Sequence, residues 1–396
     1  MEKRLSFELS RLRDHSSAYK LDLATSRVIK LSSDGSTTCN RQTYDDILHP
    51  MTDELTFRAI ELPSEKRTAN VKACHYEGGF TIWESTWFLL SFLHQELRMK
   101  EGDLAIDLGM YILSEGTHAI AGCGNGICGI HALRNGYEVL FQDLNWEVLE
   151  ESVVPNYLVN IVLRQIEADT EHAIIRNDGT ERQDKHLMGD TFQQGNGECT
   201  YSNESCPKGH NADAGDVEVI LNTSKCDTYC HATIIGTRGT GISSNSLKIP
   251  ESTERKPILN DQRRCKYELL SCMWDNMPSY AETFLAKFRN ACSLIVASEC
   301  LYRTENYPAI ANILLQYLME NDGRAYIATK RLYFGMDGGS FEFMTYINSK
   351  HSYSKHKLQA TIHKTQMLPC SSNVIDILEV RKYNTDITEI YESGAN

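Results

Sequence analysis

The sequence lacks long apolar runs and carries no excess of positive charge. No run approaches the roughly 18 apolar residues that a membrane-spanning helix needs, so no membrane segment is expected. The first residues, MEKRLSFELSRLRDHSS, contain no apolar stretch of the kind that secretory signals carry. The formal net charge of −13 argues against a nucleic-acid-binding surface and suits a basic partner.

The cysteines lack a regular framework. There are thirteen, an odd number, and they are scattered among Asn, Gln and Met. This usage is typical of the reducing interior of a cell, so we expect a cytoplasmic and nuclear protein. The segment CDTYCH at 226–231, with Cys199, Cys206 and His210 before it, fits no closed zinc pattern well, and no metal site is expected.

Polar and apolar segments alternate along the chain in large blocks. Residues 1–60 are rich in Ser, Thr, Asp and Arg with broken apolar periodicity, which predicts a poorly ordered N-terminal extension. Residues 61–396 are expected to form one domain with insertions at 110–121 and about 166–265. Without the longer insertion, the core consists of 61–165 and 266–396 and has the size of one α/β domain.

The periodicity within the core predicts alternating strands and helices, hence a mainly parallel sheet with right-handed crossovers. The last two apolar segments alternate strictly and are expected to form an antiparallel pair. The expected helices are 86–100 with Ser85 as its cap, 127–136, and one or two helices over 146–165 that Pro155 interrupts. The expected strands are 103–109, 137–145, 216–223, 229–237, 292–302, 323–335, 356–364 and 373–383.

A glycine-rich loop follows the first of these strands. Residues 122–129 read GCGNGICG, and Gly124 opens the pattern GxGxxG before an apolar helix. Such a loop turns tightly and lets a ligand approach the amides of the helix, whereas the alternative is a purely structural turn. Asp143 ends the next strand at about the distance from Gly122 at which an acid can accept both hydroxyls of a ribose.

Both dinucleotide and S-adenosylmethionine sites use this arrangement. The expected antiparallel pair at the end of the sheet and the lack of a second mononucleotide half favour S-adenosylmethionine. We therefore expect S-adenosyl-L-methionine as the cofactor.

Several motifs resemble the protein-histidine methyltransferases, seven-strand eukaryotic enzymes that modify a histidine of a large-subunit ribosomal protein. The motifs are YEGGFTIWEST (76–86), FQDLN (141–145), VVPNYLVN (153–160), ASECLY (297–302) and YFGMDGG (333–339). The resemblance covers nearly all of the core. It implies a class I, seven-strand, Rossmann-like sheet with helices on both faces, and a basic ribosomal protein as substrate.

The resemblance also implies which residues hold the cofactor. The first glycine of the loop would lie beneath it, Gln142, Asp143 and Leu144 would hold its ribose and adenine, and Trp274 would stack on adenine. This chain has Cys272-Met273 where the family has Gly-Asp before the Trp, so the acidic hydrogen bond to adenine is missing unless Asp275 supplies it. The complete expected set is Ile82, Trp83, Glu84, Ser85, Thr86, Asp107, Gly109, Gly122, Gly124, Gly126, Gln142, Asp143, Leu144, Trp274 and Ser298.

Glu299 and Tyr302 are the expected catalytic residues, because this acid and aromatic spacing borders the acceptor channel in related protein methyltransferases. Neutral imidazole is already a nucleophile, and Glu299 can accept its other ring N–H and stabilise the imidazolium. A lysine acceptor would need desolvation and an aromatic wall, for which Tyr302, Tyr333 and Phe334 are available. Protein-lysine methyltransferase and a non-catalytic binding or chaperone-like relative therefore stay open as alternatives.

The segment at 110–121 splits the cofactor turn. Without residues 110–122 the text reads LAIDLGCGNGICGI, the family's usual strand and loop. Three explanations are compatible with the sequence. They are a translated intron, an insertion that loops outward, and a strand formed by THAIAGCG in place of AIDLG. Loop-closure entropy tolerates such an insertion, but the geometry of the turn is more demanding. Weak cofactor binding is therefore expected for the chain as written.

Overall fold

The computed structural model describes residues 1–22, 27–31, 54–60, 80–96, 103–108, 123–163, 216–240, 267–350, 356–367 and 373–384. Gly109, Gly122, the insertion at 110–121 and most of the segment 166–265 lie outside these ranges. In the described part, no helix is long and apolar enough to cross a membrane.

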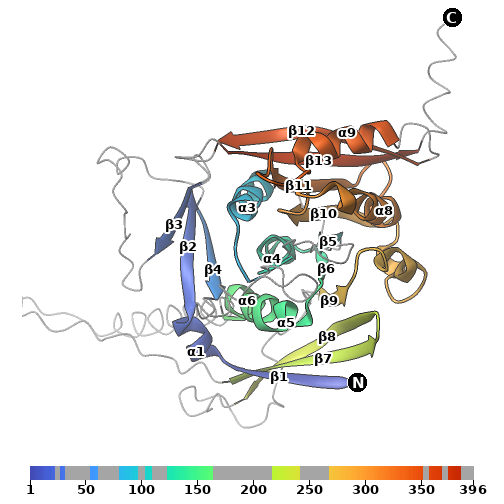
Figure 1. Cartoon of the computed structure of the whole chain (residues 1–396). Helices are drawn as coiled ribbons and strands as arrows, with labels where there is room; N and C mark the ends of the chain where they lie inside the picture. Colours follow the sequence, from blue (N-terminus) through green and yellow to red (C-terminus); the bar gives the residue numbers. More distant parts are fainter. Residues whose placement is uncertain are drawn as a thin grey trace, which may run out of the picture.

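A large mixed sheet organises the chain (Figure 1). Five central strands run parallel, and the last strand pair and the far edge are antiparallel. The expected α/β class and the antiparallel pair are confirmed. In spatial order the strands are β1 (Glu2–Glu8), β7 (Asp216–Cys226), β8 (Tyr229–Thr240), β9 (Tyr267–Cys272), β6 (Glu138–Asp143), β5 (Leu104–Leu108), β10 (Cys292–Ser298), β11 (Arg324–Lys330), β13 (Val374–Asn384) and β12 (His356–Met367).

The sheet has ten strands, whereas the resemblance implies seven. The β7–β8 hairpin pairs with β9, and β1 pairs with β7, so three strands extend one edge. Because more than half of the chain separates β1 from β7, no local pattern predicts that they pair. The order of the sheet thus depends on a contact of very long range.

The prediction of a poorly ordered segment over 1–60 is wrong for the residues that the structure describes there. Besides β1, they form α1 (Leu9–Asp14), β2 (Ser16–Asp22), β3 (Arg27–Leu31) and β4 (Glu54–Ile60). The last three make a small separate sheet in the order β3-β2-β4. Leu5 and Phe7 of β1 pack against the main core although charged residues surround them in sequence. The high charge thus concealed a period of two.

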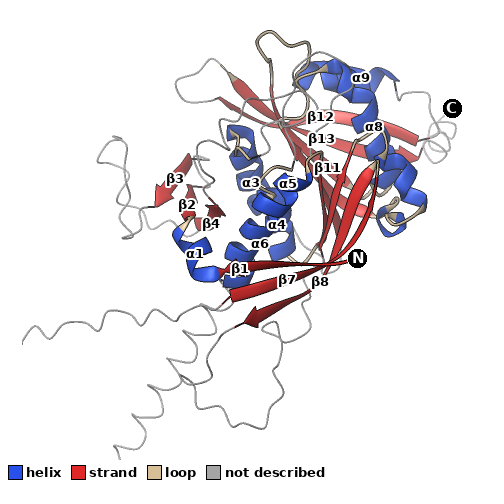
Figure 2. Ribbon diagram, turned by 60° about the horizontal axis from the view of Figure 1, so that its bottom comes forward, coloured by secondary structure: helices blue, strands red, loops and turns tan. Residues whose placement is uncertain are grey.

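Helices cover both faces of the main sheet (Figure 2). One face carries α3 (Glu84–Glu96) and α4 (Ile127–Arg134), and the other carries α8 (Tyr307–Tyr317) and α9 (Ser340–Lys350). Both faces are therefore buried, as a parallel sheet requires. The predicted helices over 86–100 and 127–136 are confirmed where they are described. However, Ser85 lies buried inside the first turn of α3 and does not cap it.

Pro155 does not interrupt the segment after β6. Backbone angles remain helical from α5 (Trp146–Val148) through α6 (Val154–Tyr157), with π-helical turns over Leu149–Val153 and Leu158–Val162. A wider turn before the proline relieves the clash of its ring with the preceding carbonyl groups. The prediction of an interruption is therefore wrong, and one continuous rod packs under the glycine loop.

Candidate active site

The site lies where three neighbouring parallel strands end. Asp107 is near the end of β5, Asp143 ends β6, and Ser298 ends β10 with Glu299 directly after it. Since β6, β5 and β10 are adjacent and parallel, their carboxyl ends meet at one edge. Ligands of open α/β sheets bind at such an edge.

The glycine loop is fixed by both strand-end acids. Gly124 and Gly126 have φ angles of 54° and 65°, which favour glycine. The Gly129 N–H donates to Asp107 Oδ2 at 2.8 Å, and the Gly124 N–H reaches Asp143 Oδ2 at 3.3 Å. A Cβ on Gly129 would lie 2.4 Å from the Phe141 ring, so the third glycine is needed for packing.

Asn156 supports this loop from the rod below. Its side-chain Nδ2 donates to the Asn125 carbonyl at 3.0 Å, while its Oδ1 accepts the Ile60 N–H at 2.8 Å. One fully buried amide thus joins the glycine loop to β4. Asn156 belongs to the motif VVPNYLVN, but its supporting role was not predicted from the sequence.

The two strand-end carboxyl groups are buried without a cation. Burial raises the pKa of Asp107 to about 8, with the nearby Asp143 adding to the effect and the Gly129 N–H opposing it. Burial likewise raises the pKa of Asp143 to about 7, against the N–H groups of Asn145, Gly124 and Leu144. Among the described residues, neither acid has an ion pair. Such a pair fits a ligand that brings hydroxyl donors or positive charge.

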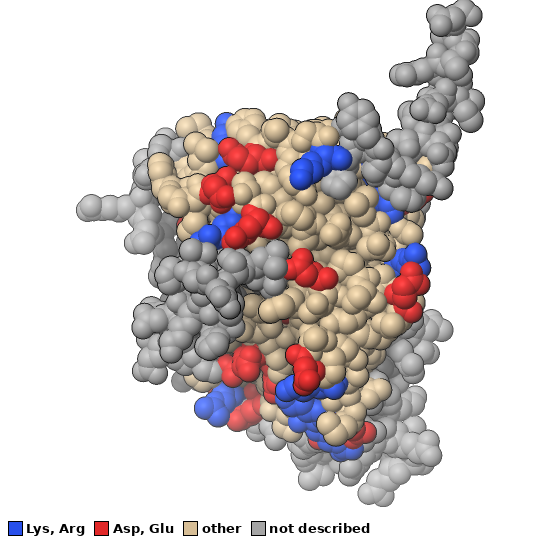
Figure 3. All heavy atoms as spheres, turned by 45° about the vertical axis from the view of Figure 1, so that its right-hand side comes forward, with Lys and Arg blue, Asp and Glu red and all other residues tan. Residues whose placement is uncertain are grey.

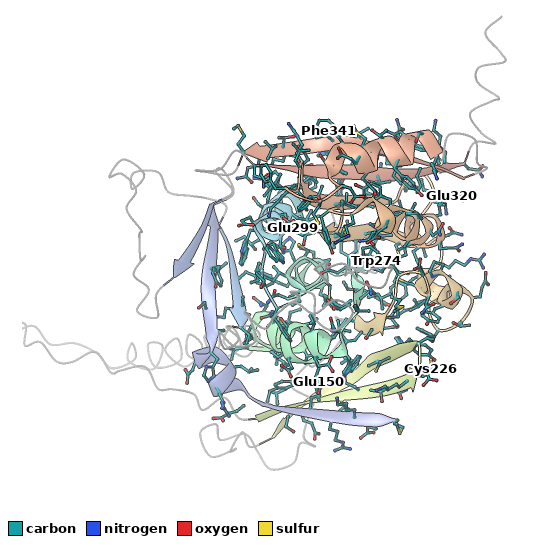
Figure 4. All side chains as sticks on the ribbon, in the orientation of Figure 1. Glu150, Cys226, Trp274, Glu299, Glu320 and Phe341 are labelled. Carbon is teal, nitrogen blue, oxygen red and sulfur yellow. The ribbon has the colours of Figure 1, made fainter. Side chains whose placement is uncertain are left out.

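Gln142 and Trp274 bind each other. The Trp274 indole N–H donates to Gln142 Oε1 at 2.8 Å, and Gln142 Nε2 donates to the Cys272 carbonyl at 2.9 Å. Trp274 is 0% exposed within the core, near the centre of Figure 4. Protein atoms cover the whole Trp274 ring in this structure, and its stacking on adenine stays a prediction; the following Asp275 is exposed.

Leu144, which follows Asp143, is also held by a hydrogen bond from the neighbouring strand β9. Its carbonyl accepts the Ser271 hydroxyl at 2.7 Å, and its side chain is partly buried against the core. The segment from Gln142 to Leu144 is thus fixed by β9 and by the residues after it.

The start of α3 approaches the end of β10. Thr86 Oγ1 and Ser298 Oγ are 2.9 Å apart, and the Cys128 thiol of α4 contacts the Thr86 carbonyl at 3.8 Å. Ile82 and Trp83 are partly buried, and Glu84 is exposed. The Trp83 Nε1 atom is buried and has no hydrogen-bond partner within the described structure, so it can donate to a ligand.

Glu299 is the most constrained acid of the site. Its φ of 54° is unusual for a residue with a side chain, and the backbone is held by an N–H bond to the Ala328 carbonyl at 2.9 Å. Burial raises the pKa of Glu299, with Glu84 adding to the effect, while Lys330, Tyr333 and Ser85 oppose it. The carboxyl group thus titrates above its ordinary range.

The two oxygens of Glu299 differ in their surroundings. Oε2 accepts the Tyr333 hydroxyl at 2.6 Å, and Oε1 lies 3.9 Å from Lys330 Nζ. Oε1 is buried and forms no hydrogen bond within the described structure. Tyr302 packs edge to face on Tyr333, with the ring centroids 5.8 Å apart. One carboxylate oxygen is therefore fixed by a hydrogen bond, whereas the other forms none although Ser85 and Lys330 lie near the carboxyl group.

Most of the predicted residues meet at this edge, with Gly109 and Gly122 outside the described ranges. Lys330 and the hydrogen bond from Tyr333 were not predicted from the sequence, where Tyr333 was expected only as part of an aromatic wall. Phe334, expected in the same wall, is exposed on the outer surface. The chain turns at 333–336, where the Met336 N–H donates to the Tyr333 carbonyl, and this turn separates the two neighbours.

Asp107→Asn should raise the melting temperature of the ligand-free chain at about pH 9. The raised pKa means that the Asp107 contribution to stability is full below the ordinary value of 3.8 and is lost as the pH rises through about 8. Each ~1 kcal/mol regained should raise the melting temperature by roughly 2–4 °C.

This gain in melting temperature should disappear at about pH 4, because the buried Asp107 is then protonated and, like the asparagine that replaces it, neutral in the folded chain. The exposed Asp322→Asn serves as a charge-matched control. An unchanged melting temperature for Asp107→Asn at the higher pH would contradict a buried carboxylate without a counter-charge.

The chain resembles several curated proteins, although no family model matches it. It is 23% identical over 287 residues to the histidine protein methyltransferase 1 homolog of Rattus norvegicus, covering 72% of this chain and 53% of that protein. Against the Bos taurus homolog it is 25% identical over 285 residues, 72% and 52% of the two chains. The Dictyostelium discoideum homolog is 35% identical over 85 residues, 22% and 23% of the two chains.

The chain spans about half the length of the mammalian relatives it matches. These similarities extend over most of the present chain and recur in several species. They confirm the resemblance to the protein-histidine methyltransferase family that the sequence motifs indicate.

Proposed function

We propose that this chain is an S-adenosylmethionine-dependent protein methyltransferase that modifies a histidine imidazole of a large-subunit ribosomal protein. The observation that carries the proposal is Glu299 Oε1, which is buried, forms no hydrogen bond within the described structure, and lies at the same edge of the sheet as the strand-end acids. Curated relatives named as histidine protein methyltransferases support it.

The fold supports a class I assignment. Within the ten-stranded sheet, the strands from β9 to β12 form a unit of seven. Its antiparallel strand, β13, lies next to the edge strand β12. The acids and the glycine loop lie at the carboxyl ends of its central strands. The additional strands join only at the β9 edge, so they leave this arrangement intact.

The donor set of the site fits S-adenosylmethionine. Asp143 would accept the ribose hydroxyls, because its buried carboxylate is held only by backbone N–H groups among the described residues. Asp107, the glycine loop and the unpartnered Trp83 indole would complete the contacts. When bound, S-adenosylmethionine supplies a methyl group activated by a sulfonium. Trp274 would act indirectly by fixing Gln142.

Glu299 would orient the acceptor. Its Oε1 can accept the ring N–H of a histidine whose other nitrogen receives the methyl group, and a negative carboxylate stabilises the imidazolium that forms. The Tyr333 hydroxyl keeps the other oxygen in place. Tyr302 closes the side of the site through its contact with Tyr333.

Lys330 favours histidine over lysine as the acceptor. Its ammonium lies 3.9 Å from Glu299 and 5.6 Å from the centre of the Trp83 ring. A lysine acceptor would arrive as a repelled ammonium that must first lose its proton, whereas an imidazole is already largely neutral near pH 7. The negative net charge suits a basic ribosomal protein, and such a substrate is consistent with the proposed cytoplasmic and nuclear location.

Calorimetric titration of S-adenosylhomocysteine should distinguish the full chain from a variant lacking residues 110–122. We expect weak binding to the full chain and at least about tenfold tighter binding to the variant, because the deletion rejoins β5 to its loop. Equal affinities would contradict an effect of the insertion. The absence of binding to both would contradict the proposed cofactor.

Glu299→Gln should reduce methyl transfer by about a hundredfold and leave S-adenosylhomocysteine affinity unchanged. The assay uses isotopically labelled methyl donor, total large-subunit ribosomal proteins, and amino-acid analysis of the product. The surface variant Glu282→Gln is the control and should behave as the wild type. Label found only in methyl-lysine, or full activity of Glu299→Gln, would contradict the proposed acceptor site.

A further inference from the structure

The loop after β11 exposes an unusual concentration of large apolar side chains. Seven large apolar residues are exposed within the described structure, and four of them fall between residues 332 and 341. We call these four residues, Leu332, Phe334, Met336 and Phe341, the apolar rim. Single exposed apolar residues are common, but a cluster indicates an interaction surface.

The segment that carries the rim is hydrogen-bonded to residues 302–304, which follow Glu299. The Gly338 N–H donates to the Tyr302 carbonyl at 3.1 Å, and Asp337 accepts the Thr304 N–H at 3.3 Å. A Cβ on Gly338 would lie 2.3 Å from the Leu301 carbonyl oxygen, so only glycine allows this approach. The rim is therefore held in a defined position next to Tyr302.

The rim is also continuous with the acceptor site. Tyr333 points inward to Glu299, while its neighbours Leu332 and Phe334 are 58% and 85% exposed. Tyr333 thus points inward between two exposed neighbours, and the exposed residues continue through the turn at 334–337. A protein segment that delivers its acceptor residue to Glu299 must pass close to the two outward neighbours of Tyr333.

A hollow of about 420 Å³ lies beside the rim and shares Phe341 with it. Its lining is aromatic and polar with one carboxylate: Thr304, Tyr307, Phe341, Glu342, Thr345 and Tyr346. Thr304 follows Glu299 by five residues, so the two are at most roughly 18 Å apart. Figure 4 labels Phe341 at the start of α9 and Glu299 at the end of β10.

The hollow suits a cationic side chain. The Arg331 guanidinium lies 5.1 Å from the centre of the Phe341 ring, and the Lys350 ammonium lies 5.4 Å from that of Tyr346. Both rings already hold a cation of this chain, so the attraction for an incoming Lys or Arg would come from the Glu342 carboxylate, whose buried Oε2 has no hydrogen-bond partner within the described structure. On the face drawn in Figure 3, acidic and basic residues are interspersed among the described atoms, so recognition would depend on this local combination.

We propose that the apolar rim and the hollow form the docking surface for the protein substrate. The rim contacts apolar side chains next to the acceptor residue, and the hollow receives a Lys or Arg side chain a few residues away. This inference rests on the proposed methyltransferase function. It assigns substrate selection to residues outside the cofactor site.

Phe334→Ser tests the rim in methyl transfer from labelled S-adenosylmethionine to total large-subunit ribosomal proteins. We expect KM for the protein to rise about tenfold, with kcat and S-adenosylhomocysteine affinity unchanged. Glu342→Gln should raise KM less. Met367→Ser, at a residue that is 70% exposed on β12, is the matched control and should leave KM unchanged. A wild-type KM for Phe334→Ser would overturn the proposal.

A second measurement separates this inference from the proposed function. If the wild type labels none of these proteins, the proposed function fails, and docking is tested by replacing Phe334 or Met367 with the photo-reactive p-benzoylphenylalanine. Crosslinks to the same protein mixture from position 334 and not from 367 would support the docking surface. Equal crosslinking at both positions, or none at either, would overturn it.

Discussion

The site is defined by the burial of acidic side chains at the carboxyl ends of adjacent parallel strands. Asp107, Asp143 and Glu299 are all nearly inaccessible to solvent. Burying a carboxylate is unfavourable unless hydrogen bonds or charge compensate it. Here backbone N–H groups, a tyrosine hydroxyl and one lysine provide only part of that compensation. The remaining capacity to accept hydrogen bonds makes this edge suited to binding.

Much of the surrounding architecture keeps these groups in place. The glycine loop closes on Asp107 and Asp143, and Asn156 supports it from the helical rod. Tyr333 crosses from the loop after β11 to Glu299, so the acceptor side of the site is joined to the exposed apolar rim. In the proposed function, the same loop would orient Glu299 and select the protein that reaches it.

The sequence predicted the parts of this arrangement that depend on local patterns. Strand-end Asp143 and the glycines before α4 are local signals with direct physical meanings, whereas Glu299 and Tyr302 were selected through the resemblance to related protein methyltransferases. Placement of Trp274 in the core could not be predicted locally, because the buried cluster to which it belongs includes residues of β5, α8 and β13 that lie far away in sequence. The pairing of β1 with β7 could not be predicted from local patterns either, because more than half of the chain lies between the two strands.

Proton release on ligand binding tests most directly whether the buried carboxyl groups of Asp107 and Asp143 accept hydrogen bonds from a ligand. S-adenosylhomocysteine should be titrated into the chain lacking residues 110–122 at about pH 7.5, in buffers of different ionisation enthalpy. Since the pKa of Asp143 is raised to about 7 and that of Asp107 to about 8, ligand hydroxyls that favour the carboxylates should expel protons. The account predicts a binding enthalpy that varies with the buffer, and a smaller variation in Asp143→Asn. An enthalpy independent of the buffer would contradict it.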